Sequence, residues 1–275
     1  HNSQLSVTIV NVKIGNGCDI IFSKDYSIEI SSTTIKSIEV SEEHGMNEGN
    51  ILYYFFSLPN EPEYSINIED SYFSKTGNTK LFISTVNSVT IGSTVFEYIS
   101  SPPFYINCHG NELLFSNVTF SESIKNAVNL IDLNSSEFNI TKVIFDHCTF
   151  ELISGTIYSS DSQDTVFYDC NFKNNMCTNS SNCAPCIHMT NTATLSLSSC
   201  TFFGNKGIYC GGCLYLLNSK IEITYCQFFE NKCMSSNGSR GGAIYIQHTS
   251  EIYTYSSIIG CIFDNNEAVS ASGAI

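Results

Sequence analysis

The chain has 275 residues, of which 42% are hydrophobic and 14% charged, so it can bury an extended core and is unlike a disordered polymer. Its 26 acidic residues outnumber its 12 basic ones, which gives a net charge of −14, and Arg240 is its single arginine. This balance excludes the basic surface that nucleic acids or anionic membranes bind. No apolar run approaches the roughly 20 residues of a membrane span, so we expect no membrane contact within this segment.

One eight-residue pattern, apolar-x-apolar-x-x-small-x-apolar, recurs along the chain at intervals of 22 to 38 residues. Steps of two place side chains on one face of a strand, and the single step of three requires a bend if all four side chains are to point inward. Each copy therefore predicts two short strands that meet at a corner. The ten copies span residues 5–12, 28–35, 66–73, 89–96, 113–120, 143–150, 165–172, 195–202, 221–228 and 256–263.

A third apolar run follows several copies after a loop of variable length, as at Ile187 and Met189, and at Leu214 and Leu216. Constant strands joined by variable loops are typical of a solenoid. We therefore predict an all-β fold, a right-handed parallel β-helix of about ten rungs with three short strands each. A β-sandwich or barrel is the rival, but hairpin-connected strands would not keep one frame in register ten times.

The longest interval between copies contains an insertion over residues 40–65 that mixes carboxylates with the run Tyr53–Phe56. No 12-residue calcium loop is present there, so a solvated loop is expected rather than a calcium site. The aromatic run is either the third strand of its rung, which we favour, or part of a contact surface.

Phenylalanine fills the last position of most copies, and its rings are predicted to stack along the core. The positions are Phe73, Phe96, Phe120, Phe150, Phe172, Phe202, Phe228 and Phe263. Asparagine follows three residues later in the C-terminal copies, where an amide can bond its own turn, adopt a left-handed conformation, or bond the copy on the next rung. These residues are Asn175, Asn205, Asn231 and Asn266. The pairs Gly211–Gly212 and Gly241–Gly242 predict sharp turns back into a strand.

The combination of F-x-x-N with G-G-A-I, clearest at Phe228 to Asn231 and Gly241 to Ile244, covers residues 165–275. It resembles the repeats of chlamydial polymorphic outer membrane proteins and of similar surface proteins from parasitic protists. The resemblance implies a β-helical surface rod linked to adhesion. Residues 1–164 share the frame without this signature.

The thirteen cysteines form two groups, apart from Cys18 and Cys108. The first group occupies the small position of the template and is predicted to be a ladder of buried thiols, Cys148, Cys170, Cys200, Cys226 and Cys261. The second group lies in loops and before the third strand, and it predicts disulfides of unassigned connectivity among Cys177, Cys183, Cys186, Cys210, Cys213 and Cys233. Aligned rungs would place Cys183 beside Cys210 and Cys186 beside Cys213.

Two C-x-x-C pairs, at 183–186 and 210–213, also fit a four-thiolate zinc site. We favour disulfides because the spacing of the pairs follows from the repeat length and because secretion favours oxidation. We accordingly expect no metal and no cofactor.

Five N-glycosylation sequons accompany the cysteines and favour a eukaryotic secretory route, hence an extracellular or cell-surface location. The acceptors are Asn117, Asn134, Asn139, Asn179 and Asn237. A chain rich in Asn, Ser and Thr generates this triplet often, so the sequons support the location without establishing it.

Catalysis is the alternative, because the same fold hosts polysaccharide lyases and glycoside hydrolases. The best candidate cluster is Asp146, His147 and Asp169, which are predicted to fill the outward corner of consecutive rungs. A solvated polar corner is commoner than a catalytic one, and we favour it here. The equivalent corners hold Glu69 and Asp70, Ser198 and Ser199, and Thr224 and Tyr225.

The sequence thus predicts a non-catalytic rod that acts as an adhesin or as a structural component of an extracellular assembly. Its partners would be a protein or glycan at a cell surface, or copies of itself. We also expect residues 1–275 to be a single β-helix segment of a longer chain, with further rungs or a cap beyond Ile275, because the last copy stops where a third strand should begin.

Overall fold

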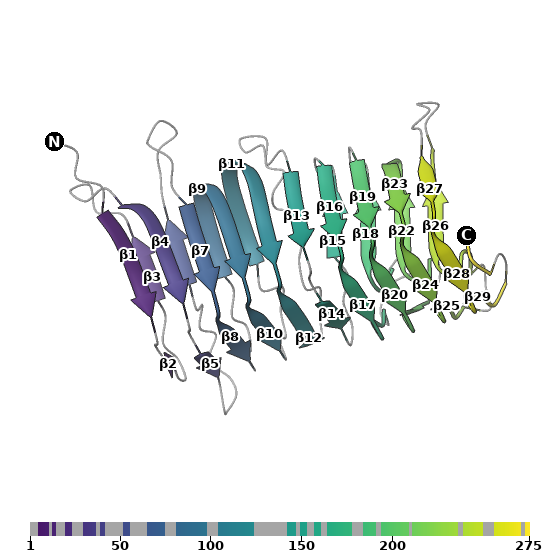
Figure 1. The fold of residues 1–275 in the computed structure, drawn as a ribbon, viewed down its shortest axis with the longest axis horizontal. Helices are drawn as coiled ribbons and strands as arrows, with labels where there is room; N and C mark the ends of the chain where they lie inside the picture. Colours follow the sequence, from purple (N-terminus) through teal and green to yellow (C-terminus); the bar gives the residue numbers. More distant parts are fainter. Residues whose placement is uncertain are drawn as a thin grey trace.

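A computed structural model shows a rod of stacked parallel strands, with the N-terminus toward one end and the C-terminus at the other (Figure 1). It describes the backbone of residues 5–10, 13–14, 20–23, 30–36, 39–41, 52–55, 65–74, 81–97, 104–123, 142–146, 149–152, 157–160, 164–177, 184–190, 194–208, 211–235, 239–249, 256–270 and 273–275. Side chains are described over residues 68–71, 90–96, 114–121 and the parts of 164–275 just given. Every regular element in these residues is a strand, which confirms the all-β prediction.

Sheet A forms one long wall of the rod and contains the first strand of each template copy. Its main path joins β1 (Leu5–Val10), β4 (Ile30–Lys36), β7 (Ser65–Glu69), β9 (Leu81–Gly92), β11 (Phe104–Ser116), β13 (Lys142–Asp146), β16 (Asp164–Tyr168), β19 (Thr194–Ser198), β23 (Lys220–Thr224) and β27 (Ser257–Ile259). Two further strands, β3 (Ile20–Ser23) and β6 (Leu52–Phe55), lie off this path.

Sheet B forms the adjoining wall and contains the second strand of each copy. It joins β2 (Lys13–Ile14), β5 (Glu39–Ser41), β8 (Tyr72–Ser74), β10 (Val95–Glu97), β12 (Thr119–Ser123), β14 (Thr149–Leu152), β17 (Asn171–Lys173), β20 (Thr201–Phe203), β24 (Gln227–Phe229) and β28 (Ile262–Asp264).

Two smaller sheets close the coil in the C-terminal half. Sheet C joins β15 (Ile157–Ser160), β18 (Ile187–Thr190), β22 (Leu214–Leu217) and β26 (Ile244–Gln247), and it contains the predicted third strand. Sheet D joins β21 (Lys206–Gly207), β25 (Lys232–Cys233) and β29 (Glu267–Ala268). The prediction of three strands per rung omitted sheet D, because strands of two residues leave no periodic pattern in the sequence.

The register of sheets A and B confirms eight of the ten template copies, from 66–73 to 256–263. Ile68 pairs with Ile91, for example, and Phe73 pairs with Phe96. Further along the rod, Phe202 pairs with Phe228. All these pairings are parallel, as a coil that always turns the same way requires.

The register contradicts the prediction for the first two copies. Thr33 and Ile35 pair with Ile66 and Ile68, the first two inward residues of copy 66–73. The predicted copy 28–35 had placed them at the last two inward positions, opposite Ser71 and Phe73. Copy 5–12 is also displaced, by a smaller step, because Val7 was predicted at the second inward position and pairs with Thr33, which occupies the first. Both segments carry β-branched residues on alternate and on adjacent positions, so several frames fit them and the hydrophobic pattern did not fix where the corner falls.

The aromatic run in the insertion is a strand over part of its length. Strand β6 (Leu52–Phe55) pairs in parallel with β3 and with β9. The favoured prediction, that this run is a strand, is therefore confirmed, although the strand joins sheet A and not sheet C.

Phenylalanine side chains stack in the core as predicted. Phe172, Phe202 and Phe228 are fully buried, with successive ring centroids 4.6 and 4.7 Å apart and planes within 5° of parallel. Burial of each ring contributes on the order of 2–3 kcal/mol, so this column is a main source of stability. Phe96 and Phe120 form the same stack nearer the N-terminus.

In the seven copies whose corner the structure describes, the bend between the two strands is made by one residue in a left-handed conformation. The corner residues with positive φ are Asp70, Ser93, Asn117, Asp169, Ser199, Tyr225 and Gly260. A second such bend ends the strands of sheet B and falls on Asn174, Gly204, Glu230 and Asn265. The sequence led us to expect that the asparagines three residues after phenylalanine could adopt this conformation, but the residue before each of them adopts it instead. These asparagines are Asn175, Asn205, Asn231 and Asn266.

The glycine pairs fit their predicted turns. Gly211 and Gly241 have φ values of 63° and 61°. A Cβ atom on Gly212 would lie 1.7 Å from the carbonyl oxygen of Gly242, so a side chain there would prevent two rungs from approaching.

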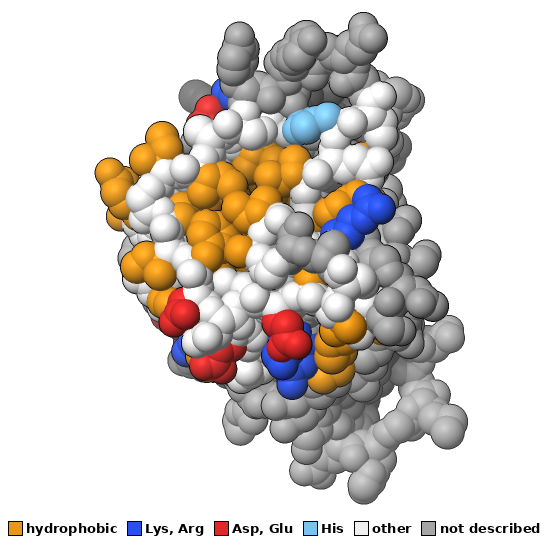
Figure 2. Space-filling view, turned by 90° about the vertical axis from the view of Figure 1, so that its right-hand side faces the viewer, with side chains coloured by type: hydrophobic (Ala, Val, Ile, Leu, Met, Phe, Trp, Pro, Cys, Tyr) orange, Lys and Arg blue, Asp and Glu red, His pale blue; other side chains and the backbone are white. Residues whose placement is uncertain are grey.

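Figure 2 looks onto the C-terminal end of the rod, where hydrophobic side chains gather in the middle of the face. In the last template copy, 256–263, the inward residues Ile258 and Phe263 are partly exposed. Their neighbours one rung earlier, Ile223 and Phe228, are fully buried.

Among the described residues there is no helix long and apolar enough to span a bilayer.

Candidate functional site

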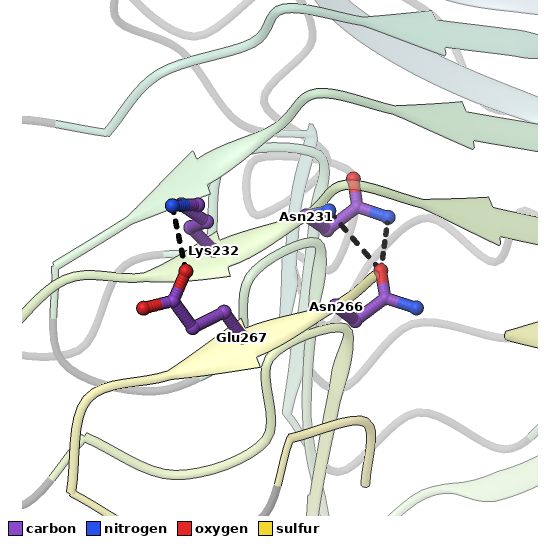
Figure 3. A network of polar contacts seen from close by, with 4 residues as sticks. All are labelled: Asn231, Lys232, Asn266 and Glu267. Atoms are coloured by element: carbon purple, nitrogen blue, oxygen red, sulfur yellow. Dashed lines mark hydrogen bonds and ion pairs between the residues drawn. The ribbon is translucent and has the colours of Figure 1, made fainter. Parts of the chain in front are cut away.

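A ladder of buried asparagines runs along the inside of the coil between sheets B and D. The Nδ2 atom of Asn175 donates to Oδ1 of Asn205, and Asn205 donates in turn to Asn231, each over 2.8 Å. Figure 3 shows the last step, in which Nδ2 and the backbone N–H of Asn231 both donate to Oδ1 of Asn266. The predicted amide contacts between rungs are therefore present, and they fix the vertical register of the bend.

Three of the ladder amides, those of Asn205, Asn231 and Asn266, also bond the backbone of the preceding rung. Nδ2 of Asn205 donates to the carbonyl oxygen of Phe172 over 3.1 Å, and Nδ2 of Asn231 donates to that of Phe202 over 3.0 Å. The side chain thus satisfies buried backbone groups at a bend where no sheet continues.

The small position of the template holds a short hydrogen-bond donor in most of the described rungs. Oγ of Ser71 and Oγ1 of Thr94 donate to the carbonyl oxygen two residues earlier, over 2.8 and 2.7 Å. The Sγ atoms of Cys170 and Cys200 make the equivalent contact with Tyr168 and Ser198, over 3.3 Å in both cases. Serine, threonine and cysteine share a small volume and a donor, and this signal was present in the sequence.

The thiols of this ladder are free. Cys170, Cys200 and Cys226 are buried, and Cys261 in the last described rung is partly exposed. The hydrogen bond with Cys200, together with burial, raises the pKa of the Cys226 thiol. Cys148 lies outside the described residues.

The cysteines of the loops differ from the predicted set of disulfides. Cys186, Cys213 and Cys233 are buried free thiols, so the disulfides expected of these three are not formed, whereas Cys177 is disulfide-bonded. Cys183 and Cys210 lie outside the described residues.

Cys186 and Cys213 lie on neighbouring rungs, as the alignment predicted, because the backbone N–H of Cys186 donates to the carbonyl oxygen of Cys213. Burial raises the pKa of Cys186 well above its ordinary value, and contact with the Cys213 thiol raises it further. Asn175 and Asn205 donate to the two sulfur atoms over 3.8 and 3.9 Å. Both cysteine side chains are buried, so they are core groups rather than accessible nucleophiles.

No cluster of three or more His, Cys, Asp or Glu residues with metal-binding geometry occurs in the part of the chain that the structure describes.

A histidine packs among aromatic rings on sheet C. His188 lies edge-on to Tyr215 with ring centroids 4.7 Å apart, and Tyr215 stacks on Tyr245. Burial lowers the pKa of His188 to about 4. The imidazole is therefore neutral at physiological pH and acts as a packing group there.

The structure describes two of the three residues in the predicted catalytic cluster. Asp169 is an exposed corner residue, and its backbone N–H donates to the carbonyl oxygen of Ser198. Asp146 ends β13 in register with Tyr168, one position before the corner, and its side chain is not described. His147 lies outside the described residues.

The corner position does not carry carboxylates on the rungs that follow Asp169. Residues Ser199, Tyr225 and Gly260 occupy it in turn. Among the sequons, Asn117 is an exposed corner residue whose Nδ2 donates to Oγ of Ser93. Asn134, Asn139, Asn179 and Asn237 lie outside the described residues.

The outer side of sheet B forms an exposed surface that sequence reasoning did not single out. We name it the sheet-B face and define it by the outward residues of four rungs and the corner beside them. It contains Asn171, Lys173, Thr201, Phe203, Tyr225, Gln227, Phe229, Ile262 and Asp264. Tyr225 is 67% exposed and Phe203 is 39% exposed. The doubled aromatic in Phe202–Phe203 and Phe228–Phe229 was the available signal, because one ring of each pair must face outward.

The comparison with protein families adds one result to this geometry. The family described as a right-handed β-helix region matches residues 60–213, more than half of the chain. The chain belongs to this right-handed β-helix family. The match covers six of the eight copies whose register was predicted correctly, from 66–73 to 195–202, and agrees with the parallel pairing in all four sheets. Comparisons with curated proteins and with solved structures gave no significant match.

Proposed function

We propose that this chain is part of an extracellular rod that acts as an adhesin or as a structural component of an assembly at a cell surface, without catalytic activity. The observation that carries the proposal is the contrast between inner and outer positions. Inward positions repeat the same residue types from rung to rung, and outward positions vary. Such a rod is a scaffold that displays different side chains along its length.

The extracellular location is supported by the sequons and by the thirteen cysteines, which cytosolic chains seldom carry without a metal or redox motif. The F-x-x-N and G-G-A-I repeats support a relationship with the polymorphic outer membrane proteins and the protist surface proteins that they resemble. A eukaryotic member fits the sequons better than a bacterial one.

The second candidate is a polysaccharide lyase or glycoside hydrolase, and the pair Asp146 and Asp169 favours it. Glycoside hydrolysis uses two carboxyl groups about 5–10 Å apart, and these residues belong to neighbouring rungs. The corner positions after Asp169 hold a serine, a tyrosine and a glycine, so the following rungs do not extend an acidic site.

A turnover assay separates the two candidates. The purified chain is incubated with a panel of neutral and acidic polysaccharides, and new reducing ends and unsaturated products are measured. We expect none. Asp169→Asn, with Asp264→Asn as the matched control carboxylate, identifies the source of any activity. Cleavage that Asp169→Asn abolishes and Asp264→Asn retains would overturn the proposal.

A binding assay distinguishes an adhesin from a structural component of an assembly. Saturable attachment of the chain to intact cells or extracellular matrix supports an adhesin, and concentration-dependent polymerisation in sedimentation supports a structural component. Failure of both would also contradict the proposal.

A further inference from the structure

One outward column of the sheet-B face runs from a cation through two aromatic rings to an anion. Lys173 pairs in register with Phe203, which pairs with Phe229. Phe229 in turn pairs with Asp264 on the next rung. Lys173, Phe203 and Asp264 are exposed, and Phe229 is partly exposed. At about 4.8 Å per strand, the two charges lie about 14 Å apart with the rings between them.

Neither of these charges is paired within the rod. Lys173 and Asp264 form no ion pair and no side-chain hydrogen bond in the part of the chain that the structure describes. By contrast, Lys232 on sheet D pairs with Glu267 on the next rung over 2.6 Å. Lys173 and Asp264 stand three rungs apart, so they cannot neutralise each other within one chain. Exposed aromatic rings between polar groups are typical of an interface with a partner.

The column is complementary to its own copy turned end over end. We consider a second copy that faces the first about a two-fold axis running along the strands, midway between β20 and β24. This rotation reverses the rod axis and places Lys173 opposite Asp264 of the second copy. It also places Phe203 opposite Phe229 of the second copy, and the symmetry repeats both contacts. Sheets packed face to face lie about 10 Å apart with their strands nearly aligned, which allows these side chains to meet.

The corner column beside the sheet-B strands fits the same arrangement. Asp169, Ser199, Tyr225 and Gly260 occupy this corner on successive rungs. The rotation places Asp169 opposite Gly260 of the second copy, so no second carboxylate faces it. Tyr225, which is 67% exposed, lies opposite Ser199, whose small side chain leaves room for the ring.

The two-fold arrangement with both rods pointing the same way is disfavoured. Its axis runs along the rod, so each residue of the column would face its own copy. Lys173 would then meet Lys173, and Asp264 would meet Asp264, and opposed like charges at an interface are unfavourable. The net charge of −14 already repels two copies of the chain, so the contacts between opposite charges decide the orientation.

We propose that the sheet-B face is an interface between two copies of this chain, packed with their rod axes antiparallel, with Phe203 against Phe229 and Lys173 against Asp264. This inference rests on the proposed function, since it names a second copy as the partner of a structural rod. An interface of four short strands belongs to the small class, so the expected dissociation constant is on the order of 10–100 µM.

Analytical ultracentrifugation of the whole chain, at concentrations on either side of this value, tests the proposal. The parent chain should change from monomer to dimer as the concentration rises. Lys173→Asp places two carboxylates opposite each other at both ends of the interface and should weaken dimerisation at least about tenfold. The double variant Lys173→Asp with Asp264→Lys exchanges the charges, so opposite charges meet again. Its dissociation constant should return to within about threefold of the parent value.

Matched controls separate the interface from general charge and hydrophobicity. Lys206→Asp makes the same change of charge on sheet D, where Lys206 is exposed, and should dimerise as the parent does. Phe203→Ala removes an aromatic contact from both halves of the interface and should weaken dimerisation on the order of tenfold. Met234→Ala is its control, since Met234 is 43% exposed and lies outside the sheet-B face. Circular dichroism of each variant checks that the fold is retained.

Three results would overturn the inference: a chain that stays monomeric well above the expected dissociation constant, association that Lys173→Asp and Phe203→Ala leave unchanged, or a double variant that associates no better than Lys173→Asp alone. Attachment to cells by a chain that stays monomeric would contradict this inference and leave the proposed function standing. Polysaccharide cleavage by a chain that dimerises through the sheet-B face would contradict the proposed function and leave the interface standing.

Discussion

The rungs over residues 65–123 and those over residues 164–270 share one frame but fill it differently. The small position holds Ser71, Thr94 and Val118 in the first region, and free thiols in the second. Phe96 and Phe120 stack at 5.3 Å with planes 14° apart, whereas Phe202 and Phe228 stack at 4.7 Å and 2°. The more regular stacking coincides with the region that contains the asparagine ladder.

The asparagine ladder is the main difference between the regions. The position three residues after phenylalanine is Thr76, Ile99 and Ser123 in the first region, and asparagine in the second. Strand β12 continues through Ser123, whereas β17, β20 and β24 each end two residues before the ladder asparagine. The eight-residue template alone therefore specifies sheets A and B, whereas the buried asparagine adds a second bend and sheet D.

The largest expected effect comes from removing one amide in the middle of the ladder. Asn205→Leu deprives the N–H groups of Asn175 and the carbonyl oxygen of Phe172 of their partner. Each buried group left unpaired costs about 1–3 kcal/mol, so the free energy of unfolding should fall by about 3–6 kcal/mol. Denaturant unfolding measures it.

The control for the ladder variant is Gln227→Leu, which removes an exposed amide of sheet B and should change stability by less than about 1 kcal/mol. Equal effects of the two substitutions would show that the ladder does not stabilise the C-terminal region.

Acidification should destabilise the region around sheet C. The pKa of His188 is about 4 in the folded chain and about 6.5 when unfolded, so the unfolded state binds a proton first. The stabilisation is complete above about pH 6.5 and is lost as the pH falls toward 4, by up to about 3 kcal/mol. Unfolding free energies of the parent chain and of His188→Phe, measured at several pH values, should show a shallower slope in the variant. Identical slopes would contradict a buried neutral imidazole.

A stabilising substitution is expected at Thr165, the first inward position of its copy. Its side chain is fully buried, and Oγ1 has no hydrogen-bond partner in the described structure. Thr165→Val replaces the hydroxyl with a methyl group of similar size and should raise the free energy of unfolding by about 1 kcal/mol or more. A loss of stability in the same denaturant assay would mean that the hydroxyl has a partner in solution.

The smallest effect should follow from exchanging the donor at the small position. Cys200→Ser introduces the group that donates in the N-terminal region, and the carbonyl oxygen of Ser198 is available to it. We expect a change below about 1 kcal/mol, and a larger loss for Cys200→Ala than for Cys200→Ser. The opposite order would show that the thiols act as apolar groups and that the two regions differ in more than residue choice.

Much of the fold could be predicted because its inward residues recur at fixed offsets. Phe202, Cys200 and Leu197 each belong to a column that several copies define independently. Prediction failed at copies 5–12 and 28–35, where β-branched runs permit two frames, and at sheet D, where two-residue strands carry no period. The left-handed residue before each ladder asparagine was missed because Asn174, Gly204, Glu230 and Asn265 share no side-chain chemistry.

The candidate site was less predictable for a physical reason. Outward positions such as those of Tyr168, Ser198 and Thr224 are not constrained by stacking, so they show no pattern from which a function can be derived. The disulfide prediction for Cys186, Cys213 and Cys233 relied on proximity between rungs, but all three are buried free thiols. The sheet-B face became apparent only when the exposure of Phe203 and Tyr225 was known.

The adjacent residues Phe202 and Phe203 provide the most direct test of the central claim, that inner ladders hold the rod together while outer positions are free to serve binding. Phe202 is fully buried in the ring stack, and Phe203 is 39% exposed on the sheet-B face. In parallel denaturant unfolding, Phe202→Ala should lower the free energy of unfolding by about 3–5 kcal/mol and Phe203→Ala by less than about 1 kcal/mol. Equal losses for the two variants, or a larger loss for Phe203→Ala, would contradict the account.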